Sequence, residues 1–243
     1  SAGDIVIDIG AFTGDTPVLY GNATGPEGKV ISFEANPHAY EILEANARLN
    51  PHLNILPVHK AITEKRGDYV FHYSDPGFCN GGFAQEIDRG VGATGHVVPL
   101  AVEGVNLTEW LEENLPKEDW GRISFIKIDT EGYDYKILRS NRGLFKEIRP
   151  IIEAELYPEL SLREVEELYE VLQSLNYEVF QQHKGRVCSL ESLTKSLTKK
   201  ELKELFINIK SGEDIVAYPQ ERVPTDKLKK TMKISLIQPS RNN

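Results

Sequence analysis

The chain has 243 residues, of which 40% are hydrophobic and 27% charged, and its formal net charge is −9. This composition is typical of a folded globular protein and excludes a largely disordered chain. The acidic balance argues against broad binding to nucleic acid or anionic lipid, because phosphate contacts need clustered Lys and Arg. No apolar run approaches the ~20 residues that span a membrane. Cys79 and Cys188 lack metal-ligand spacing, so we expect free thiols and a cytoplasmic protein.

Strand-like and helix-like runs alternate along the chain, which is typical of an α/β fold with a mostly parallel sheet covered on both faces. The run "DIVIDI", residues 4–9, predicts a first strand buried on both sides, because it lacks polar alternation. Thr16 followed by Pro17 predicts the start of a short helix, with Thr16 as its cap. Further strands are predicted at 25–34, 53–62, 68–74, 96–102, 122–129, 148–156, 177–182 and 213–219.

The remaining predicted helices occupy 36–50, 106–115, 135–145, 161–176 and 198–206. Capping boxes mark the start of the last two, at Ser161 with Glu164 and at Thr198 with Glu201. The glycine-rich stretch 75–95 is too long for a tight hairpin, and loops of this length are usually functional or mobile. We expect one domain over 1–218, with insertions at about 68–102 and 186–210, followed by a C-terminal tail at 219–243.

A glycine turn, "DIGAFTGD", follows the first predicted strand. A strand, a glycine turn and a helix start together form a general ligand cradle, because the helix-end N–H groups are unpaired. Gly10 and Gly14 lack the middle glycine of the dinucleotide fingerprint, and no P-loop lysine follows. Asp8 and Asp15 flank the turn, where they would repel a phosphate and suit a cationic or amino-bearing ligand.

A second acid, Glu34, ends the second predicted strand about 20 residues after Gly14, where a carboxylate can accept hydrogen bonds from both ribose hydroxyls. This position favours a ribose-bearing ligand and does not separate NAD from S-adenosylmethionine.

A third motif, "IKIDTEGYD", puts Lys127, Asp129, Glu131 and Asp134 at the carboxyl end of another core strand, the edge where such sheets bind ligands. Strand alternation places Lys127 and Asp129 on the same side, and Gly132 permits a sharp turn into the next helix. A purely structural alternative is that Asp129 or Thr130 caps this helix.

In this order the segments resemble the FkbM family of S-adenosylmethionine-dependent methyltransferases. The matching pieces are "DIGAFTGD", "VISFEANPHAYEILEANARLN", "IKIDTEGYDYKIL", "RPIIEAEL" and "GEDIVAYP", and they span roughly 4–218. The Lys-x-Asp-x-Glu-Gly pattern is the most specific part. Phe12 departs from the family, which often has Asn there, and 186–210 looks longer and more helical than usual.

The resemblance implies a Rossmann-like class I methyltransferase fold. Its seven-stranded, mostly parallel sheet has an antiparallel last strand, helices on both faces and a β insertion before the fourth core strand. The implied reaction is O-methylation of a small-molecule or glycan hydroxyl. Implied cofactor-binding residues are Asp8, Gly10, Ala11, Thr13, Gly14, Glu34, Ala35, Ala61 and Ile62. Implied catalytic residues are Asp129, Glu131 and Lys127. The family often marks its loop at Asn80, Gly81 and Gly82 with Asn and Gly.

An alcohol acceptor must lose its proton, so a nearby base contributes to the reaction. Asp129 and Glu131 are our candidates, together with Glu155 if its strand is adjacent. His59, His72 and His183 remain alternative bases. A divalent-metal site at Asp129, Glu131, Glu153 and Glu155 is also conceivable, because hard cations take carboxylate oxygens. The acids lack a recognisable ligand spacing, so we expect no metal.

Two other functions stay open. An NAD(P)-linked oxidoreductase or epimerase is disfavoured by the glycine spacing and by the absence of a Tyr-x-x-x-Lys pair, although "YDYK" offers a Tyr and a Lys. The second open function is a non-catalytic module that binds S-adenosylmethionine and recruits a partner. We expect an acceptor molecule as partner, no nucleic acid and no membrane span, and the oligomeric state is open.

Overall fold

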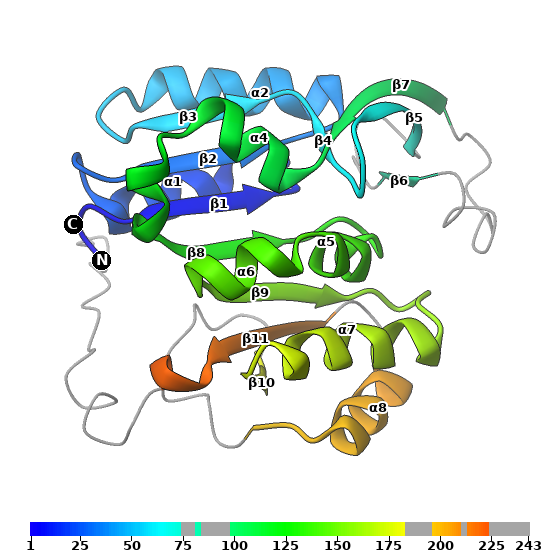
Figure 1. Ribbon diagram of the computed structural model, residues 1–243. Coiled ribbons are helices and arrows are strands. Elements are labelled where there is room, and N and C mark those ends of the chain that lie inside the picture. Colours follow the sequence, from blue (N-terminus) through cyan, green and yellow to red (C-terminus); the bar gives the residue numbers. More distant parts are fainter. Residues whose placement is uncertain (74–80, 84–97, 183–195, 210–212, 224–243) are drawn as a thin grey trace, which may run out of the picture.

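Seven strands form the main sheet of the computed structural model, in the spatial order β10-β11-β9-β8-β1-β2-β3 (Figure 1). The structure describes residues 1–73, 81–83, 98–182, 196–209 and 213–223. In chain order the strands are β1 (Ile5–Ile9), β2 (Lys29–Phe33), β3 (Ile55–Val58), β8 (Ile123–Ile128), β9 (Ile151–Leu156), β10 (Tyr177–Gln181) and β11 (Glu213–Pro219). Only β11 runs antiparallel to its neighbours β9 and β10. The predicted sheet with an antiparallel last strand is confirmed.

A second, four-stranded sheet in the order β4-β7-β5-β6 precedes β8 in the chain. Its strands are β4 (Ala61–Ile62), β5 (Gly67–Tyr73), β6 (Gly81–Phe83) and β7 (Val98–Val105). In Figure 1 this sheet stands beside the carboxyl ends of β1 and β2. The predicted β insertion before the fourth core strand is therefore confirmed, and it borders the edge where a ligand site is expected.

Helices cover both faces of the main sheet. Figure 1 shows α1 and α2 on its far side and α4, α5, α6 and α7 on its near side. The helices are α1 (Asp15–Thr24), α2 (Pro37–Leu49), α4 (Leu107–Asn114), α5 (Asp134–Ser140), α6 (Arg142–Ile148), α7 (Leu162–Ser174) and α8 (Lys199–Asn208), with 3₁₀ turns η1 (Lys117–Arg122) and η3 (Gln220–Arg222). Both predicted capping boxes are present, before α7 and α8. None of the described helices is long and apolar enough to cross a bilayer.

Two helix predictions need correction. α1 begins at Asp15, with the left-handed Gly14 at its cap position, so Thr16 lies inside the first turn instead of capping it. The Thr16 hydroxyl instead donates to Asp8, a buried acceptor that satisfies it better than a helix end. The single helix predicted at 135–145 is divided into α5 and α6 at Asn141, whose amide oxygen accepts from the backbone and hydroxyl of Thr108 in α4.

The core explains why the first strand lacks polar alternation, because all five residues of β1 are buried. Ile5, Ile7 and Ile9 pack into the main cluster, which includes Trp110 of α4, whose ring meets Phe33 of β2 edge-on. Both cysteines, Asn80, His183, most of the stretch 75–95, residues 186–195 and 210 of the second insertion, and the tail from 224 onward lie outside the described residues. The proposed domain and insertion boundaries therefore stay predictions.

Candidate active site

A cavity of about 330 Å³ opens at the carboxyl edge of the main sheet. Its walls come from the turn after β1, the end of β2, the start of β4, one residue of β5, and β8 with the loop that follows it. The lining residues are 9–12, 15, 16, 33–35, 60–62, 71, 127 and 129–131. All three sequence motifs thus meet at one cavity of ligand size.

The two glycines of the turn after β1 serve the packing of the protein itself. Gly10 has a φ of 82°, and a Cβ there would lie 1.8 Å from the carbonyl oxygen of Asp129. Gly14 has a φ of 94°, and a Cβ there would lie 2.9 Å from Leu43 of α2. Gly10 therefore lets the turn after β1 touch the loop after β8, so that the two loops form one continuous wall.

The Glu34 carboxylate joins the end of β2 to the glycine turn. One oxygen accepts from the backbone N–H of Phe12 at 2.8 Å and the other from that of Asn36 at 2.7 Å. Burial raises the pKa of Glu34 to about 7, against these two hydrogen bonds, which lower it. Each carboxylate oxygen has a second lone pair, so Glu34 can still accept hydrogen bonds from a ligand in the cavity.

Six of the nine predicted cofactor residues line the cavity: Gly10, Ala11, Glu34, Ala35, Ala61 and Ile62. The other three lie behind it. Asp8 is wholly buried, and burial raises the pKa of its carboxyl group. The Thr13 carbonyl accepts from Asn46 of α2 at 2.7 Å, and Gly14 packs on the same helix. Sequence reasoning did not name Phe12, Lys60 and Phe71 as lining residues. Phe71 comes from the second sheet, whose approach no sequence signal indicated.

Lys127 holds a positive charge between acids on the two neighbouring strands and in the loop after its own strand. The strand register sets it opposite Asp8 of β1 and Glu153 of β9, and its ammonium group donates to Asp129 at 2.7 Å. Burial lowers the pKa of Lys127, but Asp8 and Asp129 raise it by more, so the pKa lies above its ordinary value. Lys127 therefore stays charged and orients Asp129 instead of acting as a base.

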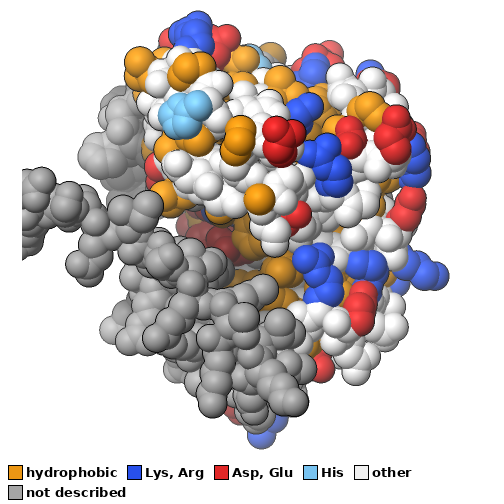
Figure 2. Space-filling model, turned by 90° about the vertical axis from the view of Figure 1, so that its left-hand side faces the viewer, with side chains coloured by type: hydrophobic (Ala, Val, Ile, Leu, Met, Phe, Trp, Pro, Cys, Tyr) orange, Lys and Arg blue, Asp and Glu red, His pale blue; other side chains and the backbone are white. Residues whose placement is uncertain are grey.

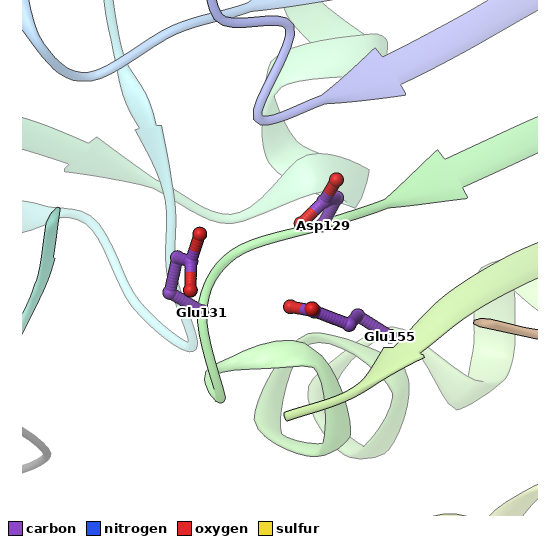
Figure 3. A group of neighbouring side chains, drawn as sticks. All are labelled: Asp129, Glu131 and Glu155. Atoms are coloured by element: carbon purple, nitrogen blue, oxygen red, sulfur yellow. The ribbon is translucent and has the colours of Figure 1, made fainter. Parts of the chain in front are cut away.

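Three carboxyl groups converge beside the carboxyl ends of β8 and β9 (Figure 3). Asp129 and Glu131 come from the loop after β8, and Glu155 comes from β9, with one oxygen of each within 4.8 Å of the others. Burial and the charge of Asp129 raise the pKa of Glu131 to about 7 and that of Glu155 to about 9. The group therefore holds at least one proton at neutral pH.

The structure bears on three alternatives left by the sequence: a four-acid metal site, a helix cap at Asp129 or Thr130, and His59 as a base. Glu153 lies opposite Lys127 and outside the group of three acids, so only part of the conceivable metal set meets. α5 has no side-chain cap, so neither Asp129 nor Thr130 caps it. The His59 ring stacks on Tyr40 of α2 at 4.7 Å and lies within 3.3 Å of the Ala35 carbonyl, so it is engaged beside the cavity instead of lining it.

Comparisons with known proteins agree with this fold. The structure of FkbM from Methylobacillus flagellatus KT matches with a TM-score of 0.53 and 13% identity, over 88% of this chain and 43% of that one. Precorrin-6y C5,15-methyltransferase from Geobacter metallireducens gives a TM-score of 0.47 and 14% identity, over 90% of this chain and 80% of that one. Fibrillarin from Aeropyrum pernix, solved with S-adenosyl-L-methionine, gives a TM-score of 0.47 and 12% identity, over 90% of this chain and 67% of that one.

No curated protein sequence is significantly similar to the chain. At 13% identity the M. flagellatus structure shows the fold alone, and the chain spans less than half the length of that protein. The family model of the methyltransferase FkbM domain, in contrast, matches residues 8–179, which include the end of β1, the residues that line the cavity, β8, β9 and the start of β10. The chain therefore belongs to the methyltransferase FkbM domain family.

Proposed function

We propose that this chain transfers a methyl group from S-adenosylmethionine to a hydroxyl of a small molecule or a glycan. The observation that carries the proposal is a single cavity that is lined both by Glu34 and by the acids Asp129 and Glu131. Membership of the FkbM family supports methyl transfer as the reaction. The acids supply a place for an acceptor hydroxyl and for the proton that it loses.

The lining residues fit the parts of this cofactor. Glu34 can accept hydrogen bonds from ribose hydroxyls, and Ala35, Ala61 and Ile62 offer a mostly apolar edge to adenine. The charges suit a sulfonium ion, since both lining lysines are already paired with acids, Lys60 with Glu103 and Lys127 with Asp129. The lining acids that have no lysine partner give the cavity a net negative charge, which attracts a cation.

The charge pattern also bears on the acceptor. On the described part of the face in Figure 2, Lys and Arg side chains are interspersed with Asp and Glu, with no gathering into one basic patch. Inside the cavity the lysines have acid partners, as described above. A neutral polyol acceptor therefore fits better than a nucleic acid or another polyanion.

When bound, S-adenosylmethionine supplies an electrophilic methyl group on a positively charged sulfur. The main task of the chain is to hold the acceptor hydroxyl in line with that methyl group and to exclude water. Lys127 binds one oxygen of Asp129, and the Asp129 side chain remains 38% exposed. Its other oxygen, Oδ1, is the site that we propose for the hydroxyl proton. Glu131, which also lines the cavity, can bind a further hydroxyl group of the acceptor.

Transfer of labelled methyl from S-adenosylmethionine into a cell extract tests this function. The wild-type chain is expected to label a product that mild alkali does not release, as an ether resists the hydrolysis that cleaves a methyl ester. Asp129→Asn keeps the size of the side chain, removes the base and is expected to lower the rate by about 10²- to 10⁴-fold.

Glu41→Gln, an exposed change on α2, is the matched control and keeps the wild-type rate. No labelled product with any extract, from a chain that binds the cofactor, would favour the non-catalytic module. An unchanged rate in Asp129→Asn would remove this residue from the mechanism.

A further inference from the structure

We infer that Asp134 is a positioning residue of the active site, whose buried carboxylate fixes Glu131 beside Glu155. This inference rests on the proposed function, because the acids that it positions are those proposed to meet the acceptor. Asp134 is the first residue of α5 and is wholly buried. It touches neither the cavity nor a proposed ligand, so its action on the reaction would pass through other residues.

The Asp134 carboxylate bridges two segments that come from different strands. Its Oδ2 accepts from the Thr130 hydroxyl at 2.6 Å and from the Thr130 backbone N–H at 3.2 Å. Its Oδ1 accepts from the backbone N–H of Glu155 at 3.0 Å. One side chain thus ties the residue before Glu131 to the backbone of Glu155.

This bridge begins where the sheet stops holding the two segments together. The paired register of β8 and β9 ends at Ile128 opposite Ala154, one residue before Asp129 and Glu155. Beyond this point Asp134 supplies the hydrogen bonds between the loop and β9. Burial raises the pKa of Asp134 to about 7, against the hydrogen bonds from Thr130 and Glu155, which lower it. A buried acceptor that takes three hydrogen bonds is a directional link between the two segments.

The bridge also holds Glu131 in a strained backbone conformation. Glu131 has a φ of 53°, a left-handed backbone that is unfavourable for a residue with a side chain. The acids around Glu131 and Glu155 are Asp129, Asp134, Glu159 and Asp214, with Tyr157 adjacent and Lys127 as the opposing charge. Keeping this backbone conformation beside Glu155 requires a fixed loop.

Thr130→Val tests the bridge without changing any charge, because it removes only the hydroxyl that Asp134 binds. Thr130→Ser restores the hydroxyl. Thr108→Val is the matched control, since the Thr108 hydroxyl donates to the Asn141 side chain at 2.8 Å, away from the cavity. Should Thr130→Val fail to fold, Asp134→Asn replaces it, because one oxygen cannot accept from both Thr130 and Glu155.

Three readouts separate positioning from simple stabilisation. In Thr130→Val, the Kd for S-adenosylhomocysteine is expected to stay within about twofold of wild type, while kcat for labelled-methyl transfer to the accepting extract fraction falls by about tenfold or more. By carbon-13 NMR of the side-chain carboxyl groups, the midpoint of the Glu155 titration falls by about one pH unit as Glu131 moves away. Thr130→Ser returns both values to wild type, and Thr108→Val leaves both unchanged.

A wild-type kcat together with an unchanged titration in Thr130→Val would overturn the inference. Equal losses in Thr130→Val and Thr108→Val would overturn it as well, because they would indicate general destabilisation. A wild-type chain that neither binds S-adenosylhomocysteine nor transfers label contradicts the proposed function instead. The carboxyl titration needs no acceptor, so it decides the positioning role in that case too.

Discussion

The Glu34 carboxylate accepts hydrogen bonds from two backbone N–H groups and also lines the cavity. Its pKa is raised to about 7 by burial. In the proposed complex, ribose hydroxyls donate to the ionised carboxylate, so protonation of Glu34 and cofactor binding compete. The affinity for the cofactor is therefore highest well above pH 7, where Glu34 is ionised, and falls as the pH drops through 7.

We expect the Kd for S-adenosylhomocysteine to be constant near pH 8 to 9 and to rise toward about tenfold per unit below pH 6, measured by calorimetry. Glu34→Gln cannot ionise and is expected to bind about tenfold more weakly at pH 8 without this pH dependence. Glu41→Gln is the control and should follow the wild-type curve. A wild-type Kd that does not change between pH 8 and 6 would show that Glu34 does not bind the ribose.

Residue identity alone did not show which side of a strand each predicted residue occupies. Asp8 lies beside the glycine turn in sequence, but it accepts from Thr16 and lies behind the cavity wall. The motif 126–134 did predict that Lys127 and Asp129 share a side, and their ion pair confirms it. Glu155 could be named only conditionally, because its approach depends on β8 and β9 being neighbours.

At the scale of elements, the turn after β1 and the loop after β8 are joined through their backbones. The Asp129 N–H donates to the Ile9 carbonyl at 2.9 Å, and Gly10 leaves no room for a side chain against the Asp129 carbonyl. These contacts join the part of the cavity proposed for the cofactor to the part proposed for the acceptor. A substitution that displaces one loop is therefore expected to displace the other.

Gly10→Ala is expected to destabilise the fold by about 2 to 4 kcal/mol, through the left-handed φ and the collision with backbone that cannot move aside. Gly143→Ala is the matched control. Gly143 lies in α6, has no atom within 4 Å of a Cβ position, and should gain about 0.5 to 1 kcal/mol as alanine. Urea unfolding of both variants measures the difference. A Gly10→Ala chain as stable as wild type would mean that the two loops do not pack as described.

The order of elements was more accessible from the sequence than the loops between them. Strands such as β1 and β8 are rich in isoleucine and lack regular polar alternation, and α7 and α8 carry capping boxes, so local chemistry marks them. The bridge from Asp134 to Thr130 and Glu155 was missed. The spacing of Thr130 and Asp134 at a helix start was a usable signal for half of it, but the contact with β9 depends on tertiary packing.

At the scale of the whole molecule, two sheets enclose one cavity. The main sheet supplies Glu34 and Asp129 at its carboxyl edge, and the second sheet adds Phe71 from the side. This arrangement follows the general rule that open α/β sheets bind ligands beyond the carboxyl ends of their strands. The fold alone would also suit NAD, and the acids and glycine spacing are what favour S-adenosylmethionine.

Calorimetric titration of the chain with S-adenosylhomocysteine, with NAD as the comparison ligand, tests this central claim most directly. The account predicts a micromolar Kd for S-adenosylhomocysteine at pH 8 and no measurable heat with NAD, because the turn lacks the middle glycine that admits a pyrophosphate. Micromolar binding of NAD without any response to S-adenosylhomocysteine would contradict it.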